Sequence, residues 1–209
     1  SMGDGMYLGR NKYSGWTISK EPIYSLEKFL EYDKTFGIGA NGEMKNVSFG
    51  LYATEDIVSV SGEVIPADGL IEIVTLNEDG KAVMKSDLPF GRYYVKEVAT
   101  DEHYILNDTK YPVEFAYGGQ EVATVEIKVN DGEKIENKLI YGSVSGKKVD
   151  ENGEALSGAV IGIFAPSETE FTKENALMTA NSDKDGGFSF DKVPFGTWLV
   201  REIEQPTGF

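Results

Sequence analysis

The stretch LPFGRYYVKEV, residues 88–98, decides the fold because it combines a turn, a strand and an acid on an apolar face. Alternate side chains of a strand point to opposite faces, so Glu97 shares a face with Tyr93. The stretch VPFGTWLVREI, residues 193–203, repeats the pattern and puts Glu202 in the same place. A carboxylate therefore lies twice where a hydrophobic core is expected.

The composition sets limits on the class of protein. The chain has 209 residues, of which 40% are hydrophobic and 11% aromatic, so it can bury real cores. Its net charge of −15 argues against nucleic acid or an anionic membrane surface as a partner. The absence of cysteine excludes disulfides and thiolate metal sites, and a single histidine argues against a catalytic triad or a multi-histidine metal centre. We therefore expect no cofactor and no metal.

Short segments with a two-residue hydrophobic period run through the chain, separated by turns rich in Gly, Asn and Asp. Examples are NVSFGLYA, LIEIVTL, KYPVEFAY and EVATVEIKV. Strands of this length and spacing indicate an all-β protein built from antiparallel sandwiches. The alternation in EYDKTFGI, residues 31–38, predicts the first strand, and the best helix candidate is a short one within residues 171–180.

An internal repeat indicates two copies of one domain. FGLYA at residues 49–53 corresponds to IGIFA at residues 161–165, just as the two glutamate stretches correspond to each other. We therefore predict a first domain over residues 25–139 and a second over residues 140–209 that lacks its last strand or strands. Residues 1–24 have no counterpart and are interpreted as a tail or as the end of a preceding module.

Two further polar residues share the situation of Glu97. Lys34 falls on the face of Phe36 in the predicted first strand, and Asn137 falls on the face of Ile135 in KIENKLI. An unpaired ion in such a place costs several kcal/mol, so these groups must satisfy one another or lie at an edge. Lys34, Glu97 and Asn137 are thus candidates for one shared site in the core of the first domain.

The chemistry of such a trio is specific. Burial favours the neutral forms of an amine and a carboxylic acid, which makes the amine a nucleophile and the acid a hydrogen-bond donor to an amide carbonyl. Attack of a lysine on the Asn137 amide would release ammonia and leave an amide cross-link. Lys28 and Lys45 are rivals to Lys34 as the nucleophile, and Asn130, in the predicted turn VNDGE, is the alternative acceptor.

Residues 147–165, KKVDENGEALSGAVIGIFA, followed by VPFGTWLVREIEQPTGF, resemble the B-type repeat of Gram-positive collagen adhesins, which SpaA-type pilin modules share. The resemblance covers roughly residues 30–209. It implies prealbumin-like (Ig-like) β-sandwiches, each with a spontaneous Lys–Asn isopeptide bond and an acidic catalyst. The chain departs from the family pattern at DKTFGIGANGE, where a Lys-x-Asp is expected.

The resemblance also assigns roles to residues. In the first domain it implies a cross-link between Lys34 and Asn137 with Glu97 as proton shuttle and carbonyl polariser. In the second domain it implies Lys148 as the lysine and Glu202 as the acid. That domain has no asparagine strand in this chain, so we expect Lys148 and Glu202 to be unreacted, as an ion pair.

These observations predict a structural protein rather than an enzyme, with cross-link formation as a single-turnover event. We expect stalk modules of a cell-wall-anchored, extracellular surface adhesin or pilus-like protein, whose partners are neighbouring modules of the same chain. The alternative is a module that binds a host matrix protein or carbohydrate through exposed aromatics such as Trp16. NSDKDG, residues 181–186, matches the start of a calcium-binding loop, but Lys192 stands where the bidentate glutamate belongs, so a turn is predicted.

Overall fold

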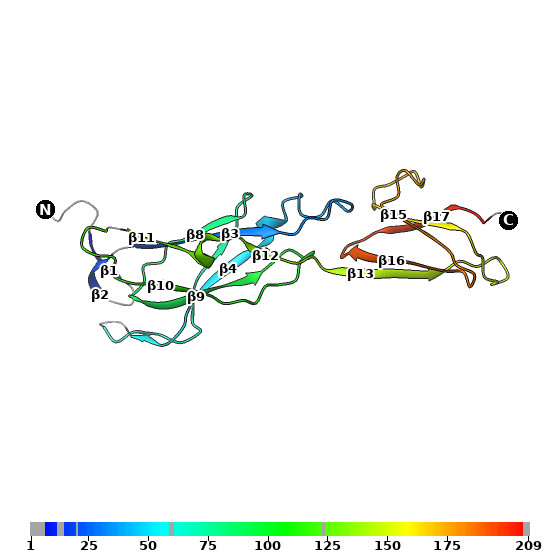
Figure 1. Ribbon diagram of the computed structural model, residues 1–209. Coiled ribbons are helices and arrows are strands. Elements are labelled where there is room, and N and C mark those ends of the chain that lie inside the picture. Colours follow the sequence, from blue (N-terminus) through cyan, green and yellow to red (C-terminus); the bar gives the residue numbers. More distant parts are fainter. Residues whose placement is uncertain (1–6, 12–14, 20, 59–60, 123, 207–209) are drawn as a thin grey trace. The chain divides into compact units, whose positions relative to one another are not determined.

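The computed structural model describes residues 7–11, 15–19, 21–58, 61–122 and 124–206 (Figure 1). The chain divides into two compact units, which are treated one at a time. Unit 1 comprises Ser1–Glu31 and Gly39–Lys138, and unit 2 comprises Tyr32–Ile38 and Leu139–Phe209. Both are built almost entirely of strands, so the prediction of an all-β protein with tandem β-sandwich domains is confirmed.

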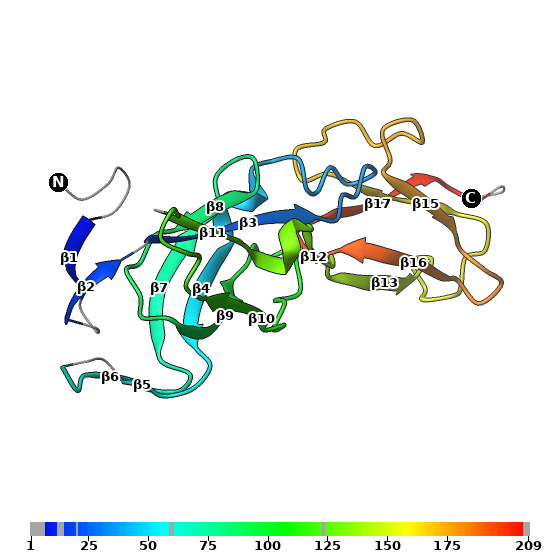
Figure 2. The same cartoon turned by 60° about the vertical axis from the view of Figure 1, so that its left-hand side comes forward.

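Unit 1 contains two four-stranded sheets, which Figure 2 shows as separate layers. The first sheet has the order β10 (Tyr111–Phe115), β9 (Gly91–Ala99), β4 (Ser48–Ala53) and β7 (Leu70–Thr75). The second is built on β3 (Glu21–Leu30), which pairs with β8 (Lys81–Met84), β11 (Thr124–Lys128) and β12 (Ile135–Asn137). All neighbours in the first sheet are antiparallel, whereas β11 and β12 both run parallel to β3.

The strand β3 supplies a strict alternation to the core. Tyr24, Leu26, Lys28 and Leu30 are buried, and the residues between them are more exposed. The side chain of Tyr24 is completely buried, although the sequence placed this residue in a tail. The sandwich therefore begins with β3, earlier than the sequence indicated.

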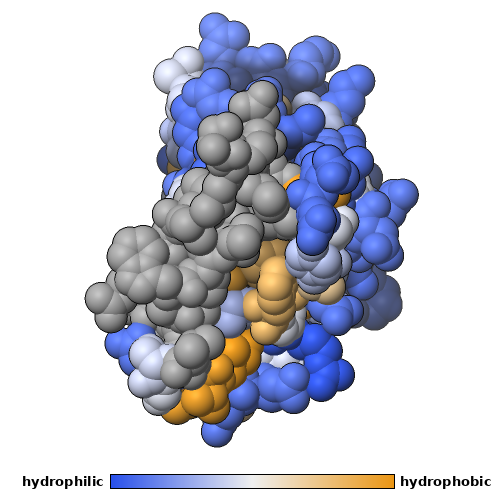
Figure 3. Space-filling view, turned by 90° about the vertical axis from the view of Figure 1, so that its left-hand side faces the viewer, coloured by the Kyte–Doolittle hydropathy of each residue, from blue (hydrophilic) through white to orange (hydrophobic). Residues whose placement is uncertain are grey.

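Two short hairpins accompany these sheets in unit 1. The strands β1 (Tyr7–Asn11) and β2 (Gly15–Ser19) form one, and β5 (Ile57–Val58) and β6 (Val64–Ile65) form the other. Figure 3 shows a described surface that is mainly hydrophilic, with apolar side chains gathered at the level of the β5–β6 hairpin. Val58 and Val64 of this hairpin are 64% and 50% exposed.

Unit 2 is a smaller arrangement of the same kind. The strand β13 (Tyr141–Lys147) pairs with β16 (Gly187–Pro194), and β14 (Val160–Phe164) lies between β15 (Met178–Asn181) and β17 (Leu199–Glu204). The core side chains are Ala159, Ile161, Ile163, Phe190 and Val193.

The predicted internal repeat is present in the strand pairing. In unit 1, Phe49 of β4 lies opposite Glu97 of β9, next to a register shift between Ser48 and Phe49. In unit 2, Ile161 of β14 lies opposite Glu202 of β17, again next to a register shift. The two acids therefore occupy equivalent positions, each beside an irregularity of the ladder.

Two local predictions are wrong. Residues 31–38 form a turn closed by a bridge between Asp33 and Ile38, because the Asp33 carboxylate accepts a hydrogen bond from the Phe36 N–H at 3.1 Å. Gly37, with φ of 72°, provides the left-handed residue that this turn needs. Residues 171–180 hold a turn followed by the start of β15 and contain no helix.

Of the helices in the described part of the chain, none is long and apolar enough to cross a membrane.

Candidate functional site

Three buried polar side chains meet in the core of unit 1. The Nζ atom of Lys28, on β3, donates to Oε1 of Glu97, on β9, at 2.6 Å. The Nδ2 atom of Asn137, on β12, donates to Oε1 and Oε2 of Glu97 at 2.9 and 2.8 Å. The three residues are 2%, 1% and 2% exposed, respectively. The site therefore joins both sheets of the sandwich through one carboxylate.

Strand register explains why these residues meet. In the parallel pair of β3 and β12, Lys28 lies opposite Ile135, and Leu30 lies opposite Asn137. Because side chains alternate along each strand, Lys28 and Asn137 point to the same face, two residues apart along the ladder. That face covers β4 and β9, from which Glu97 points back. The first and last strands of the sandwich thus offer an amine and an amide to the same acid.

The environment of Lys28 favours the loss of its charge. Burial lowers the pKa of the Lys28 ammonium below its usual value, and the hydrogen bond and charge of Glu97 only partly offset this. The ring of Phe49, which is fully buried, lies 5.6 Å from Nζ and contributes to the exclusion of water. The contact of Nζ with Oε1 of Glu97 at 2.6 Å therefore lies in a site from which water is excluded.

The amide of Asn137 is held by its nitrogen. Besides the two oxygens of Glu97, Nδ2 also donates to Oγ1 of Thr100 at 3.0 Å. Among the residues that the structure describes, Oδ1 of Asn137 is buried and has no hydrogen-bond partner. The expected contact from Glu97 to the amide carbonyl is thus replaced by one to the amide nitrogen, the atom that leaves when an amine displaces it.

The structure does not bring Lys34 to this site. Lys34 is exposed and lies in the turn of residues 34–37, within unit 2, so its selection from the sequence has to be corrected. Of its two rivals, Lys45 forms a surface ion pair with Glu78, and Lys28 is the one beside Glu97. The alternative acceptor Asn130 lies in the 3-10 turn Val129–Gly132 with φ of 55°, whereas Asn137 contacts Glu97.

The sequence around Lys28 contains a signal that favours it over Lys34. In YSLEKFL, residues 24–30, Tyr24, Leu26 and Leu30 form an apolar face of period two, and Lys28 occupies a position of that face. This is the same anomaly that singled out Glu97. Applied to β3, the criterion that found the acid would also have found the amine.

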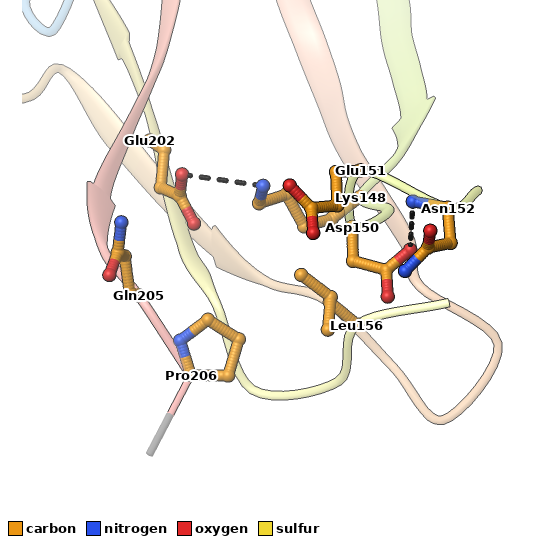
Figure 4. A pocket seen from close by; sticks show the side chains of 8 residues that line it. All are labelled: Lys148, Asp150, Glu151, Asn152, Leu156, Glu202, Gln205 and Pro206. Carbon is orange, nitrogen blue, oxygen red and sulfur yellow. Dashed lines mark hydrogen bonds and ion pairs between the residues drawn. The ribbon is translucent and has the colours of Figure 1, made fainter. Parts of the chain in front are cut away.

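Unit 2 has the equivalent pair in a different setting. Nζ of Lys148 lies 3.4 Å from Oε2 of Glu202, so the ion pair expected from the sequence is present (Figure 4). The two side chains are 26% and 29% exposed and border a cavity of about 480 Å³. The other residues that line it are Asp150, Glu151, Asn152, Leu156, Gln205 and Pro206.

The predicted turn at residues 181–186 is also present, because Oδ1 of Asp183 accepts from two backbone N–H groups at 2.8 Å.

Comparison with protein families identifies the fold. The family described as "SpaA: Prealbumin-like fold domain" matches residues 37–135, nearly all of which lie in unit 1, and residues 142–209 of unit 2. The chain belongs to this SpaA family. No curated protein matches the chain.

Several solved structures resemble these SpaA domains at low sequence identity. The Bacillus anthracis TIE protein is 19% identical with a TM-score of 0.59, and the match covers 90% of this chain and 29% of that one. The Streptococcal ancillary pilin is 22% identical with a TM-score of 0.37, covering 92% and 56%. A C-terminal fragment of the pilus adhesin SpaC from Lactobacillus rhamnosus GG is 15% identical with a TM-score of 0.44, covering 91% and 77%. The chain thus spans less than two thirds of the first two proteins.

The SpaA segments contain only some of the site residues. Glu97 lies in the first segment, and Lys148 and Glu202 lie in the second, whereas Lys28 and Asn137 fall just outside both. The family match therefore accounts for the two acids and their strands. The pairing of Lys28 with Asn137 rests on the geometry of β3 and β12.

Proposed function

We propose that this chain is a pair of structural modules from the stalk of an extracellular adhesin or pilus-like protein, and that an amide bond between Lys28 and Asn137 locks unit 1. The observation that carries the proposal is the buried contact of Lys28 and Asn137 with the same carboxylate of Glu97. The pilus and adhesin proteins among the structural neighbours support the setting at a cell surface. Glu97 acts once per chain, so the module is not an enzyme for external substrates.

The reaction follows from the contacts of the site. The Lys28 ammonium transfers a proton to Glu97, which leaves a neutral amine beside a neutral acid. The amine then attacks Cγ of Asn137. Glu97 donates its proton to Nδ2, the C–N bond breaks, ammonia leaves, and Glu97 takes the surplus proton from the new amide nitrogen. One Nζ–Cγ bond replaces one Nδ2–Cγ bond. Glu97 finishes protonated, because it passes its first proton to the departing ammonia and takes another from the new amide nitrogen.

Burial and proximity allow the amide of Asn137 to react with the amine of Lys28. A carboxamide is inert towards amines in water, but well-oriented groups within one molecule reach effective molarities of roughly 10⁵ M or more. Water is kept from the site, because the side chains of Lys28 and Glu97 are both 0% exposed. The acid therefore shares its proton with the amine rather than with solvent.

The position of the bond explains what it achieves. It ties β3 to β12, the first and last strands of the sandwich, so the two strands cannot separate when the ends of the unit are pulled. In the chain-entropy model, a cross-link that closes a loop of about 100 residues stabilises the fold by about 4–5 kcal/mol. The chain has no cysteine, and this bond supplies the constraint that a disulfide would otherwise give.

Intact-protein mass spectrometry tests the proposal. The chain should be lighter than its calculated mass by one ammonia, and digestion should yield a branched peptide that joins Lys28 to Asn137. The Lys28→Ala and Asn137→Ala variants should each show the full calculated mass. The Lys34→Ala variant is the matched control, because it removes an exposed lysine and should remain one ammonia lighter.

Two results would refute the proposal. A wild-type chain at its full mass would show that the trio is an ordinary buried hydrogen-bond network. Full mass in Lys34→Ala, with loss of ammonia retained in Lys28→Ala, would return the nucleophile to the residue selected from the sequence.

A further inference from the structure

The segment between β9 and β10, residues 100–110, is here called the site loop. It closes over the Lys28–Glu97–Asn137 trio and is tied to both strands of the proposed cross-link. The Tyr104 hydroxyl donates to the Glu31 carbonyl at 2.7 Å, next to the end of β3. The Ile105 N–H donates to the Lys138 carbonyl at 2.9 Å, next to the end of β12.

One residue of the site loop reaches the acid itself. The backbone N–H of Asn107 donates to Oε2 of Glu97 at 2.7 Å. The Asn107 side chain donates to the Glu136 carbonyl at 3.1 Å and to the Tyr111 hydroxyl at 3.0 Å. Its Oδ1 accepts from the Thr109 N–H at 3.1 Å, which closes a turn. Asn107 thus connects the catalytic carboxylate to the peptide group that precedes Asn137.

We propose that Asn107 is a positioning residue for cross-link formation, which orients Glu97 through its main chain and seals the site through its side chain. The inference rests on the proposed function, because it concerns the rate of the same reaction. It adds a residue that touches neither the amine nor the amide that react.

The two oxygens of the Glu97 carboxylate have different hydrogen-bond partners, which supports this role. Lys28 contacts Oε1, the Asn107 N–H contacts Oε2, and the Asn137 amide nitrogen spans both. Holding Oε2 from the loop side directs Oε1 to the lysine, so the proton donor and acceptor stay aligned. A free carboxylate could rotate away from this arrangement.

The side chain of Asn107 controls the approach from solvent. A cavity of about 240 Å³ lies between the site loop and β12, and both Asn107 and Asn137 line it. Ile105 and Leu106, also in its lining, are 55% and 47% exposed, so the loop alone is a thin cover. The hydrogen bonds of Asn107 to Glu136 and Tyr111 hold that cover in place.

The test measures how fast the full-length chain loses ammonia. The wild type and Asn107→Ala are made by cell-free synthesis, quenched in denaturant at successive times, and analysed by intact mass at several pH values. The control is Asp56→Ala, which removes a comparable side-chain hydrogen bond to the backbone, at 2.7 Å from the Ala67 N–H, in another loop of unit 1.

We expect Asn107→Ala to react about 10- to 100-fold more slowly, the effect that a displacement of about 1 Å has on reacting groups. Its rate profile should also shift to higher pH, because water admitted to the site favours the charged form of Lys28. Asp56→Ala should keep the wild-type rate and profile. A variant that merely destabilised the fold would lower the folded fraction without moving the profile.

The outcomes separate this inference from the proposed function. If the wild type keeps its full mass, the cross-link proposal fails and the role of Asn107 fails with it. If the wild type loses ammonia while Asn107→Ala matches its rate, or while both variants are slowed alike, only the role of Asn107 is overturned. Should Asn107→Ala not fold, Asn107→Asp keeps the turn to Thr109 and loses the two donated bonds, and a wild-type rate there would also overturn it.

Discussion

Each unit contains an equivalent lysine–glutamate pair, and the two pairs are buried to different extents. In unit 1, Lys28 and Glu97 are 2.6 Å apart with both side chains 0% exposed. In unit 2, Lys148 and Glu202 are 3.4 Å apart with side chains 26% and 29% exposed. The acids occupy equivalent positions in the strand ladders, so the difference lies in what surrounds them. In unit 1, β12 and the site loop enclose the pair, and we infer that this enclosure is what makes the proposed reaction possible.

The most direct test of this difference between the units is to make the same substitution in both. Glu97→Gln removes the acid from a buried pair, and breaking such a pair costs roughly 3–5 kcal/mol. Loss of the proposed cross-link adds about 4–5 kcal/mol. Glu202→Gln affects a partly exposed pair, for which about 0–1 kcal/mol is expected. Calorimetry should therefore show a large fall in the Tm of the unit 1 transition and almost none in that of unit 2.

Mass spectrometry on the same two variants gives the chemical half of the comparison. Glu97→Gln should restore the full calculated mass, and Glu202→Gln should leave the chain one ammonia lighter. Equal shifts in Tm for the two variants would mean that enclosure does not distinguish the pairs, and the contrast drawn between the units would be lost.

A second comparison uses the glycines that the repeat places in equivalent strands. A Cβ on Gly50 would lie 2.7 Å from the ring of Tyr52. One on Gly162 would lie 2.6 Å from Cδ1 of Ile203 and 2.7 Å from the ring of Phe164. Tyr52 is only partly buried, whereas Phe164 is fully buried. Overpacking costs about 1–3 kcal/mol, so we expect about 1 kcal/mol for Gly50→Ala and roughly 2–3 kcal/mol for Gly162→Ala.

Here unit 2 should be the more sensitive, the reverse of the acid substitutions. The loss in unit 2 is measured by urea unfolding, followed by the fluorescence of Trp198. The loss in unit 1 is measured by calorimetry. Equal losses in the two units would show that the Phe164 ring moves aside as easily as that of Tyr52.

The sequence predicted the two acids, but it offered Lys28 only as a rival to Lys34. Glu97 and Glu202 stand out because a glutamate interrupts an apolar alternation in two copies of one motif, and Asn137 stands out in the same way. The alternation of residues 31–38 is equally regular, but the Asp33 side chain caps a turn there and Gly37 completes it. Local hydrogen bonding of an aspartate outweighed the periodic pattern.

The partners of the acid depend on tertiary contacts that no local pattern shows. The parallel pairing of β12 with β3 sets the register of Asn137 to Lys28, and it joins segments from opposite ends of the unit. The Asn107 N–H that holds Glu97 belongs to the backbone of a loop and has no signature in the sequence. The repeat predicted the two domains, whereas their exact limits and the parallel strands required coordinates.

The smallest expected effect concerns the pH dependence of two aspartates that cap turns, one in each unit. Burial of Asp101 in unit 1 raises its pKa, but hydrogen bonds from Asn46 and His103 outweigh this and leave the pKa below its usual value. Hydrogen bonds from the backbone, that of Glu154 first, lower the pKa of the partly exposed Asp150 in unit 2. Both groups therefore contribute stability that is complete above the unfolded-state pKa of about 3.9 and that is lost as the pH falls through the folded-state pKa.

Because Asp101 is 7% exposed and Asp150 is more accessible to solvent, the acid sensitivity should be greater in unit 1. The Tm of each transition, followed from about pH 7 to about pH 2, should fall less steeply in Asp101→Asn than in the wild type for unit 1. The corresponding change for Asp150→Asn in unit 2 should be smaller, because solvent screens a partly exposed carboxylate. An unchanged acid slope in Asp101→Asn would show that the site loop is held by Tyr104 and Asn107 without help from its buried aspartate.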